Sequence, residues 1–183
     1  MLLLILGIVL WWASHLFRRV APRARAGMGQ AGKGAVTAGL VLSIVLMVIG
    51  YRAADPGTTW WGPTPMLKGI NNLLVLVAFY LFASSGSKNR IGTRFRHPQL
   101  TGFSLWAFAH LLVNGDLPSL VLFGGLLLWA LVEIAVINRT APWTPPAHPV
   151  PIRKEWTSAL ATVVVFVVVG LVHGWIGPDP FGM

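Results

Sequence analysis

Long apolar segments separated by short stretches rich in charge, proline or glycine dominate this chain. Six of them follow one another, at about Leu2–Phe17, Ala35–Ile49, Ile70–Ser85, Pro98–Val113, Pro118–Asn138 and Ser158–Ile176. A helix needs about 20 apolar residues to cross the roughly 30 Å hydrocarbon core of a bilayer. These segments approach that length and show no alternation of apolar and polar residues, which predicts helices rather than strands. We therefore expect an all-α, polytopic membrane helical bundle with about six transmembrane helices.

Two of the segments are short for a membrane span. The third and the fourth each have 16 residues and reach only about 24 Å, at about 1.5 Å of rise per residue. Local thinning of the bilayer or polar flanking residues must complete these two spans.

The composition supports a membrane protein. Hydrophobic residues make up 55% of the chain and charged residues only 10%, against about 25% charged residues in soluble domains. The length of 183 residues predicts a single domain over residues 1–183. Because there is no cysteine, disulfides, iron–sulfur clusters and thiolate-ligated metals are excluded. The first segment has no basic stretch before it and no convincing cleavage site after it, so we interpret it as a retained transmembrane helix rather than a signal peptide.

The basic residues predict the orientation in the membrane. All but two of the 14 lysines and arginines lie in the first, third and fifth loops, and the exceptions are Arg52 and Lys68. Lysine and arginine favour the cytoplasmic side. We therefore expect a multi-pass protein of the bacterial inner (cytoplasmic) membrane with both termini outside, in the periplasm. Anionic lipid headgroups account for the net charge of +9, so the bilayer is the expected partner and no nucleic acid is expected.

The fifth loop, at 139–157, is rich in proline, with prolines at 142, 145, 146, 149 and 151. Proline fixes φ and lacks a donor, so this cytoplasmic loop should be extended and non-helical. We expect His148, within it, to be solvated.

Two histidines lie inside apolar segments. His15, near the inner end of the first segment, is either an ordinary interfacial histidine or a ligand. The helical face of His110 carries Phe103, Trp106, Ala107 and Asn114. One imidazole against an aromatic wall suits a flat apolar cofactor, but it equally suits a hydrogen bond between helices, from His110 to Asn71 or Asn72.

Other polar residues admit simpler interpretations. His97 precedes Pro98, a favourable first residue of a helix, and it either helps bind an anion there or is solvated. His173 lies between Gly170 and Gly174, a spacing that indicates helix packing. Glu133, the only acid well inside a segment, should pair with an inner-side arginine or bond across helices. Asn71 and Asn72 either cap the third helix or line a cavity. Phosphate-binding glycine loops, HExxH and a nucleophile elbow are absent from the sequence.

The motifs WWASHLF, MVIGYR, INNLL and RHPQ…LWAFAHLLVNGD together resemble the NnrU family of bacterial membrane proteins, from Leu2 to about Asn138. The same framework resembles the plant zeta-carotene isomerase, a membrane haem enzyme that interconverts cis and trans double bonds. The resemblance implies a link to denitrification, in nitrite and nitric oxide reduction, or isomerase-like activity on an apolar small molecule. It further implies haem b as cofactor and His15 and His110 as its iron ligands, and we expect Trp106 and Phe103 to line the cofactor site.

Two observations qualify what the resemblance implies. The isomerase has a cysteine, proposed as an alternative axial ligand, where this chain has Ala107, so a ligand exchange of that kind is unavailable. His110 lies 12 residues after Pro98, roughly 18 Å along its helix, whereas His15 lies near the inner face. A first helix that continues to Ala21 would reduce this mismatch in depth. His97 is closer in depth to His15, so the rival ligand pair is His15 and His97.

Two other functions compete with haem binding. Arg96-His97-Pro98 also occurs in small membrane methyltransferases, but these need a tyrosine-bearing segment after the last spans, and no tyrosine follows Glu133 here. The other is a non-catalytic assembly factor for respiratory enzymes, in which the polar residues serve only packing. The sequence leaves the substrate, catalytic status and oligomeric state open.

Overall fold

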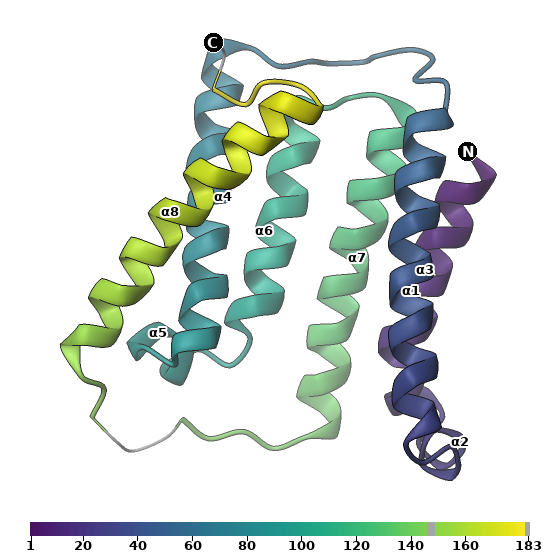
Figure 1. Ribbon diagram of the computed structural model, residues 1–183, viewed down its shortest axis with the longest axis vertical. Helices are drawn as coiled ribbons and strands as arrows, with labels where there is room; N and C mark the ends of the chain where they lie inside the picture. The colour runs from purple at the N-terminus through teal and green to yellow at the C-terminus, as the bar shows by residue number, and fades with distance from the viewer. Residues whose placement is uncertain (146–148, 182–183) are drawn as a thin grey trace.

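The computed structural model describes residues 1–145 and 149–181, so His148 lies outside the described residues. In these two ranges every regular element is a helix, which confirms the all-α fold (Figure 1). The helices are α1 (Leu2–Val20), α2 (Pro22–Gly27), α3 (Ala31–Ala53), α4 (Pro65–Ser87), α5 (Arg90–Arg94), α6 (Pro98–Val113), α7 (Leu117–Thr140) and α8 (Ile152–Ile176).

Five of the described helices, α1, α3, α4, α7 and α8, are long and apolar enough to cross a membrane. The remaining long helix, α6, has 16 residues, yet it runs through the same layer as its neighbours α4 and α7 (Figure 1). Many large apolar side chains stay exposed on the surfaces of these helices; on α8 they include Val164, Val168 and Leu171. Such faces belong in lipid, so the chain is a multi-pass membrane protein.

The boundaries agree with the expectation for α6 and differ for α4. α6 begins at Pro98 with His97 as its N-cap, as predicted. α4 has 23 residues and begins at Pro65, where the Thr64 hydroxyl accepts a hydrogen bond from the Leu67 amide at 3.2 Å. The predicted start at Ile70 and the capping role of Asn71 or Asn72 were wrong. Thr64 and Pro65 are the residues that start this helix, and Lys68 and Gly69 interrupt the apolar run after them, so apolar content alone places the start too late.

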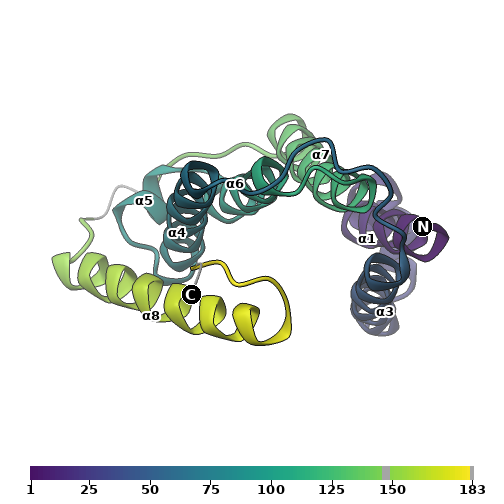
Figure 2. The ribbon, with the colours of Figure 1, turned by 90° about the horizontal axis from the view of Figure 1, so that it is seen from above.

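The helices form an arc when they are seen end-on (Figure 2). Along it follow α8, α4, α6 and α7, and then the pair of α1 and α3. α1 packs against α3 and α7, α6 packs between α4 and α7, and α8 packs against α4. A buried cluster of Leu4, Ile8, Met47 and Leu126 joins α1, α3 and α7.

Glycines let α1 and α3 approach closely. A Cβ atom at Gly50 would overlap the backbone of Leu4, and one at Gly7 would come within 2.9 Å of the Ser43 carbonyl. Close approach through small residues is a common way to pack helices in a membrane, where lipid tails are as apolar as the side chains.

The two ends of the bundle differ in charge. We call the end that carries α2, α5 and the α7–α8 connection the basic end; α1 begins and α8 finishes at the opposite end (Figure 1). At the opposite end the α3–α4 loop pairs with the α6–α7 turn, since the Trp60 amide donates to the Gly115 carbonyl at 2.9 Å. The Trp61 indole also donates to the Leu111 carbonyl at 2.8 Å. The cytoplasmic assignment of the basic end stays a prediction.

Candidate functional site

A cavity of about 520 Å³ lies in the half of the molecule away from the basic end. Small-molecule and cofactor sites generally have volumes of about 300–1,000 Å³. Side chains from α3, α4, α6, α7 and α8 line it, together with the segment Gly177–Phe181, which we call the tail. The inner curve of the arc therefore holds a site that elements from most of the chain build together.

Two imidazoles line this cavity, His110 of α6 and His173 of α8. The Nδ1 atom of His110 bonds the Trp106 carbonyl at 2.9 Å, and that of His173 bonds the Pro178 carbonyl at 2.7 Å. A carbonyl only accepts, so each Nδ1 carries the hydrogen. In the neutral ring the lone pair is then on Nε2, the arrangement that a metal-ligating histidine needs.

Aromatic rings form much of the cavity wall. Trp106 and Phe123 pack beside His110, with ring centroids 4.9 and 4.7 Å away. Phe166 of α8 contacts Phe79 of α4 at 6.4 Å and Phe181 of the tail at 5.7 Å, both edge to face. Such a wall favours a flat, largely apolar ligand.

Polar groups of α4 line the same cavity. Lys68, Asn71 and Asn72 contribute to it, and the buried Oδ1 of Asn71 has no hydrogen-bond partner among the described residues. Asn72 donates to the Pro180 carbonyl at 2.8 Å. The expected hydrogen bond between His110 and Asn71 or Asn72 is not among those that the described residues make: the His110 Nδ1 atom bonds its own helix, and the two asparagines bond each other and the Pro180 carbonyl. The second expectation for the asparagines, that they line a cavity, is confirmed.

The tail explains the glycines around His173. The Phe181 ring lies against Gly170, where a Cβ atom would overlap it, and Asp179 lies beside Gly174. The two glycines, Gly170 and Gly174, thus pack against the chain's own tail rather than against a neighbouring helix. The glycine spacing predicts a packing role for His173 and not its place in the cavity lining, because nothing in the local sequence indicates that the tail folds back.

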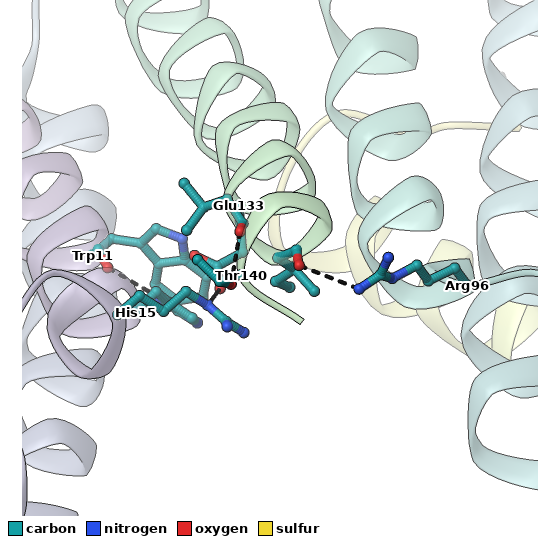
Figure 3. Close-up of polar contacts among 8 residues, drawn as sticks. Trp11, His15, Arg96, Glu133 and Thr140 are labelled. Atoms are coloured by element: carbon teal, nitrogen blue, oxygen red, sulfur yellow. Dashed lines mark hydrogen bonds and ion pairs between the residues drawn. The ribbon is translucent and has the colours of Figure 1, made fainter. Parts of the chain in front are cut away.

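His15 lies elsewhere, in a group of side chains between α1 and α7 that we call the α1–α7 cluster: Trp11, His15, Arg19, Trp129 and Glu133. Figure 3 shows three of them, Trp11, His15 and Glu133. The His15 Nδ1 atom bonds the Trp11 carbonyl at 3.0 Å. Its ring packs against those of Trp11 and Trp129, at centroid distances of 4.2 and 4.4 Å. Arg19 donates to Glu133 at 2.7 Å, which confirms the predicted pairing of this acid with an arginine.

Aromatic rings occupy the space between His15 and His110. Trp11 stacks on Phe103 at 6.1 Å, and Phe103 contacts Trp106 at 5.2 Å. Of the four residues expected to hold a cofactor, His110 and Trp106 line the cavity, whereas His15 and Phe103 are not among the residues that line it. The structure therefore does not bring His15 and His110 together around one cavity.

His97, the rival ligand, connects helices at the basic end. Its Nε2 atom donates to Asn138 Oδ1 at 2.8 Å, and the neighbouring Arg96 donates to the Ile137 carbonyl at 3.2 Å. Figure 3 shows the Arg96 side chain reaching the last turn of α7. Carbonyls at a helix C-terminus lack partners within the helix, so this contact ties the start of α6 to the end of α7.

A family model described as NnrU protein matches residues 3–180. Neither a curated protein nor a solved structure matches the chain. The matched range spans both the cavity and the α1–α7 cluster.

Proposed function

Because this chain belongs to the NnrU family, we propose that it is a membrane protein that binds haem b in the cavity, with His110 as an axial ligand. The observation that carries the proposal is an imidazole with a free Nε2 in an aromatic-walled cavity. Imidazole is a frequent axial ligand of haem iron. A neutral ring also costs less at membrane depth than a permanent charge.

The other lining residues suit the same ligand. Haem is flat and mostly apolar and carries two carboxylates at one edge. The Trp106 and Phe123 rings offer apolar contact beside His110 and exclude water from it. Lys68 offers a cation to a carboxylate, and the Asn71 carbonyl oxygen is free to accept a hydrogen bond. When bound, haem would supply a redox-active iron.

With the proposed haem, the NnrU family favours a role beside nitrite and nitric oxide reduction, as a redox sensor or a factor that responds to nitric oxide. Isomerisation of an apolar substrate has less support. Ala107, at the position of the isomerase cysteine, is completely buried and is not among the residues that line the cavity. Position 107 therefore offers neither a ligand nor access to a bound molecule.

The motif that suggested a methyltransferase, Arg96-His97-Pro98, has another explanation in the structure. The side chains of Arg96 and His97 are engaged by the end of α7, so their role here is structural. A non-catalytic assembly factor remains the rival, and it predicts a protein without haem.

A visible spectrum tests the proposal. Protein expressed with adequate haem and purified in mild detergent should show a Soret band, and His110→Ala should lose it. His97→Ala is the matched control and should keep it, because His97 bonds α7 outside the cavity. Gel filtration and the amount of each variant in the membrane show that it is folded. A folded, colourless wild-type protein would overturn haem binding and favour the assembly factor.

A further inference from the structure

The cavity of His110 also holds a second imidazole, that of His173. We infer that His173 is the second axial ligand of the haem; this inference rests on the proposed function and replaces His15 as the partner of His110. It is carried by the presence of His110 and His173 in the lining of one cavity, from two helices that both pack against α4.

The tail prepares His173 for this role. The Pro178 carbonyl holds Nδ1 at 2.7 Å, which leaves Nε2 as the ligating atom. Asn72 of α4 holds the tail in turn, through the Pro180 carbonyl at 2.8 Å. A ligating histidine generally has such a partner on its other nitrogen, which fixes its tautomer and the orientation of its ring.

The Nδ1 atom of His15 also bonds a carbonyl, that of Trp11, but His15 does not line the cavity. Its ring lies between Trp11 and Trp129, and Trp11, Phe103 and Trp106 pack between it and His110. His173, by contrast, is exposed and is not enclosed by rings. A cofactor between His110 and His173 needs no movement of the packed aromatic core, whereas one between His15 and His110 requires that core to open.

Two imidazoles on one iron would determine what the site can do. Held by both residues, the haem would supply an iron suited to electron transfer or redox sensing rather than to binding a substrate. Of the two residues His173 would be the less firmly placed, because it lies at the end of α8 beside the tail, whereas α6 is packed on both sides.

Spectroscopy of the haem-loaded protein tests the inference. The wild type should be low-spin in electron paramagnetic resonance, with the near-infrared magnetic circular dichroism of two imidazoles. His173→Ala should retain haem but become high-spin, and added imidazole should restore the low-spin state. His173→Met should stay low-spin and gain the absorption band of a sulfur-ligated iron. His15→Ala, with its ring in the closed cluster, should keep the wild-type spectrum.

The outcomes separate this inference from the proposed function. A wild type without haem sinks both. Haem that stays low-spin with an unchanged spectrum in His173→Ala overturns the role of His173 alone, and loss of the low-spin state in His15→Ala instead assigns the ligand to His15. Haem that is lost in His173→Ala and is not restored by imidazole also overturns the inference, since His173 would then only shape the cavity.

Discussion

Two histidines of this chain share a local setting and differ in their surroundings. Each lies four residues after a tryptophan in an apolar helix, and each Nδ1 bonds that tryptophan's carbonyl, at 3.0 Å for His15 and 2.9 Å for His110. His15 is half-buried with its ring packed against those of Trp11 and Trp129, whereas His110 lines a cavity of about 520 Å³. The pattern Trp-x-x-x-His therefore fixes the tautomer of a helical histidine but not its role.

Most of the difference between the surroundings of His15 and His110 comes from side chains of α7. Near the basic end it gives Trp129, whose ring packs against His15, and the acid Glu133, which pairs with Arg19, to the α1–α7 cluster. Nearer the opposite end it gives Phe123 beside His110, and the arc of helices leaves the remaining side open to the cavity. One half of the molecule thus holds the α1–α7 cluster and the other the cavity.

We expect the largest loss of stability from breaking the ion pair of the α1–α7 cluster. Arg19→Ala leaves Glu133 buried without its partner, and the Oε2 atom of Glu133 already lacks one among the described residues. Breaking a buried pair in this way typically costs several kcal/mol. We expect a loss of about 3 kcal/mol, at the low end of that range, because the Arg19 side chain is 32% exposed. Reversible unfolding in mixed detergents measures it.

Two controls accompany that variant. Arg18→Ala removes an exposed neighbouring charge and should change stability by about 0.5 kcal/mol at most. Combining Arg19→Met with Glu133→Leu should recover most of the loss, because no unpaired charge is then buried. If Arg18→Ala proves as costly as Arg19→Ala, net charge rather than the ion pair stabilises this half.

A pair of enlarged side chains tests the contrast between the two halves directly. Ala130, next to Trp129, is completely buried, so Ala130→Phe should cost about 2 kcal/mol through overpacking. Val75 lines the cavity, so Val75→Phe should leave the unfolding transition nearly unchanged while it prevents haem uptake. Similar destabilisation by both would mean that the cavity half is as tightly packed as the core.

Releasing the tail should lower the stability by a smaller amount. Asn72→Ala removes the hydrogen bond to the Pro180 carbonyl and should cost about 1 kcal/mol. The readout is hydrogen exchange after Gly177, which should become faster while exchange in α1 stays the same. The matched control is Asn114→Ala, because Asn114 also lines the cavity but bonds the His110 carbonyl of its own helix rather than the tail. Equal exchange in both variants would show that Asn72 does not hold the tail.

Local patterns and electrostatic necessity were sufficient to predict part of this structure. Apolar length located the spans, proline marked the start of α6, and a lone buried acid required the arginine that the structure supplies. The rise of roughly 18 Å from Pro98 to His110 counted against the pair of His15 and His110, and these two residues do not line one cavity. Tertiary features escaped prediction: the tail that places His173 on the cavity wall depends on contacts from Asn72 and Gly170, which are distant in sequence from Pro180 or lack a side chain to mark them.

The smallest expected effect, and a direct test of the ligand pair that the family resemblance implies, comes from His15→Phe. A phenyl ring keeps the packing against Trp11 and Trp129. It loses only one hydrogen bond, to a carbonyl that lies within the helix. A swap of similar volume should change stability by less than about 1 kcal/mol and leave the haem content unaltered. His110→Phe keeps its contacts with Trp106 and Phe123 equally well, yet it should abolish haem binding because the ligating nitrogen is gone. Haem content per folded protein, measured side by side, decides the matter: if both variants lose haem alike, the aromatic core between the two histidines opens in solution and His15 reaches the iron.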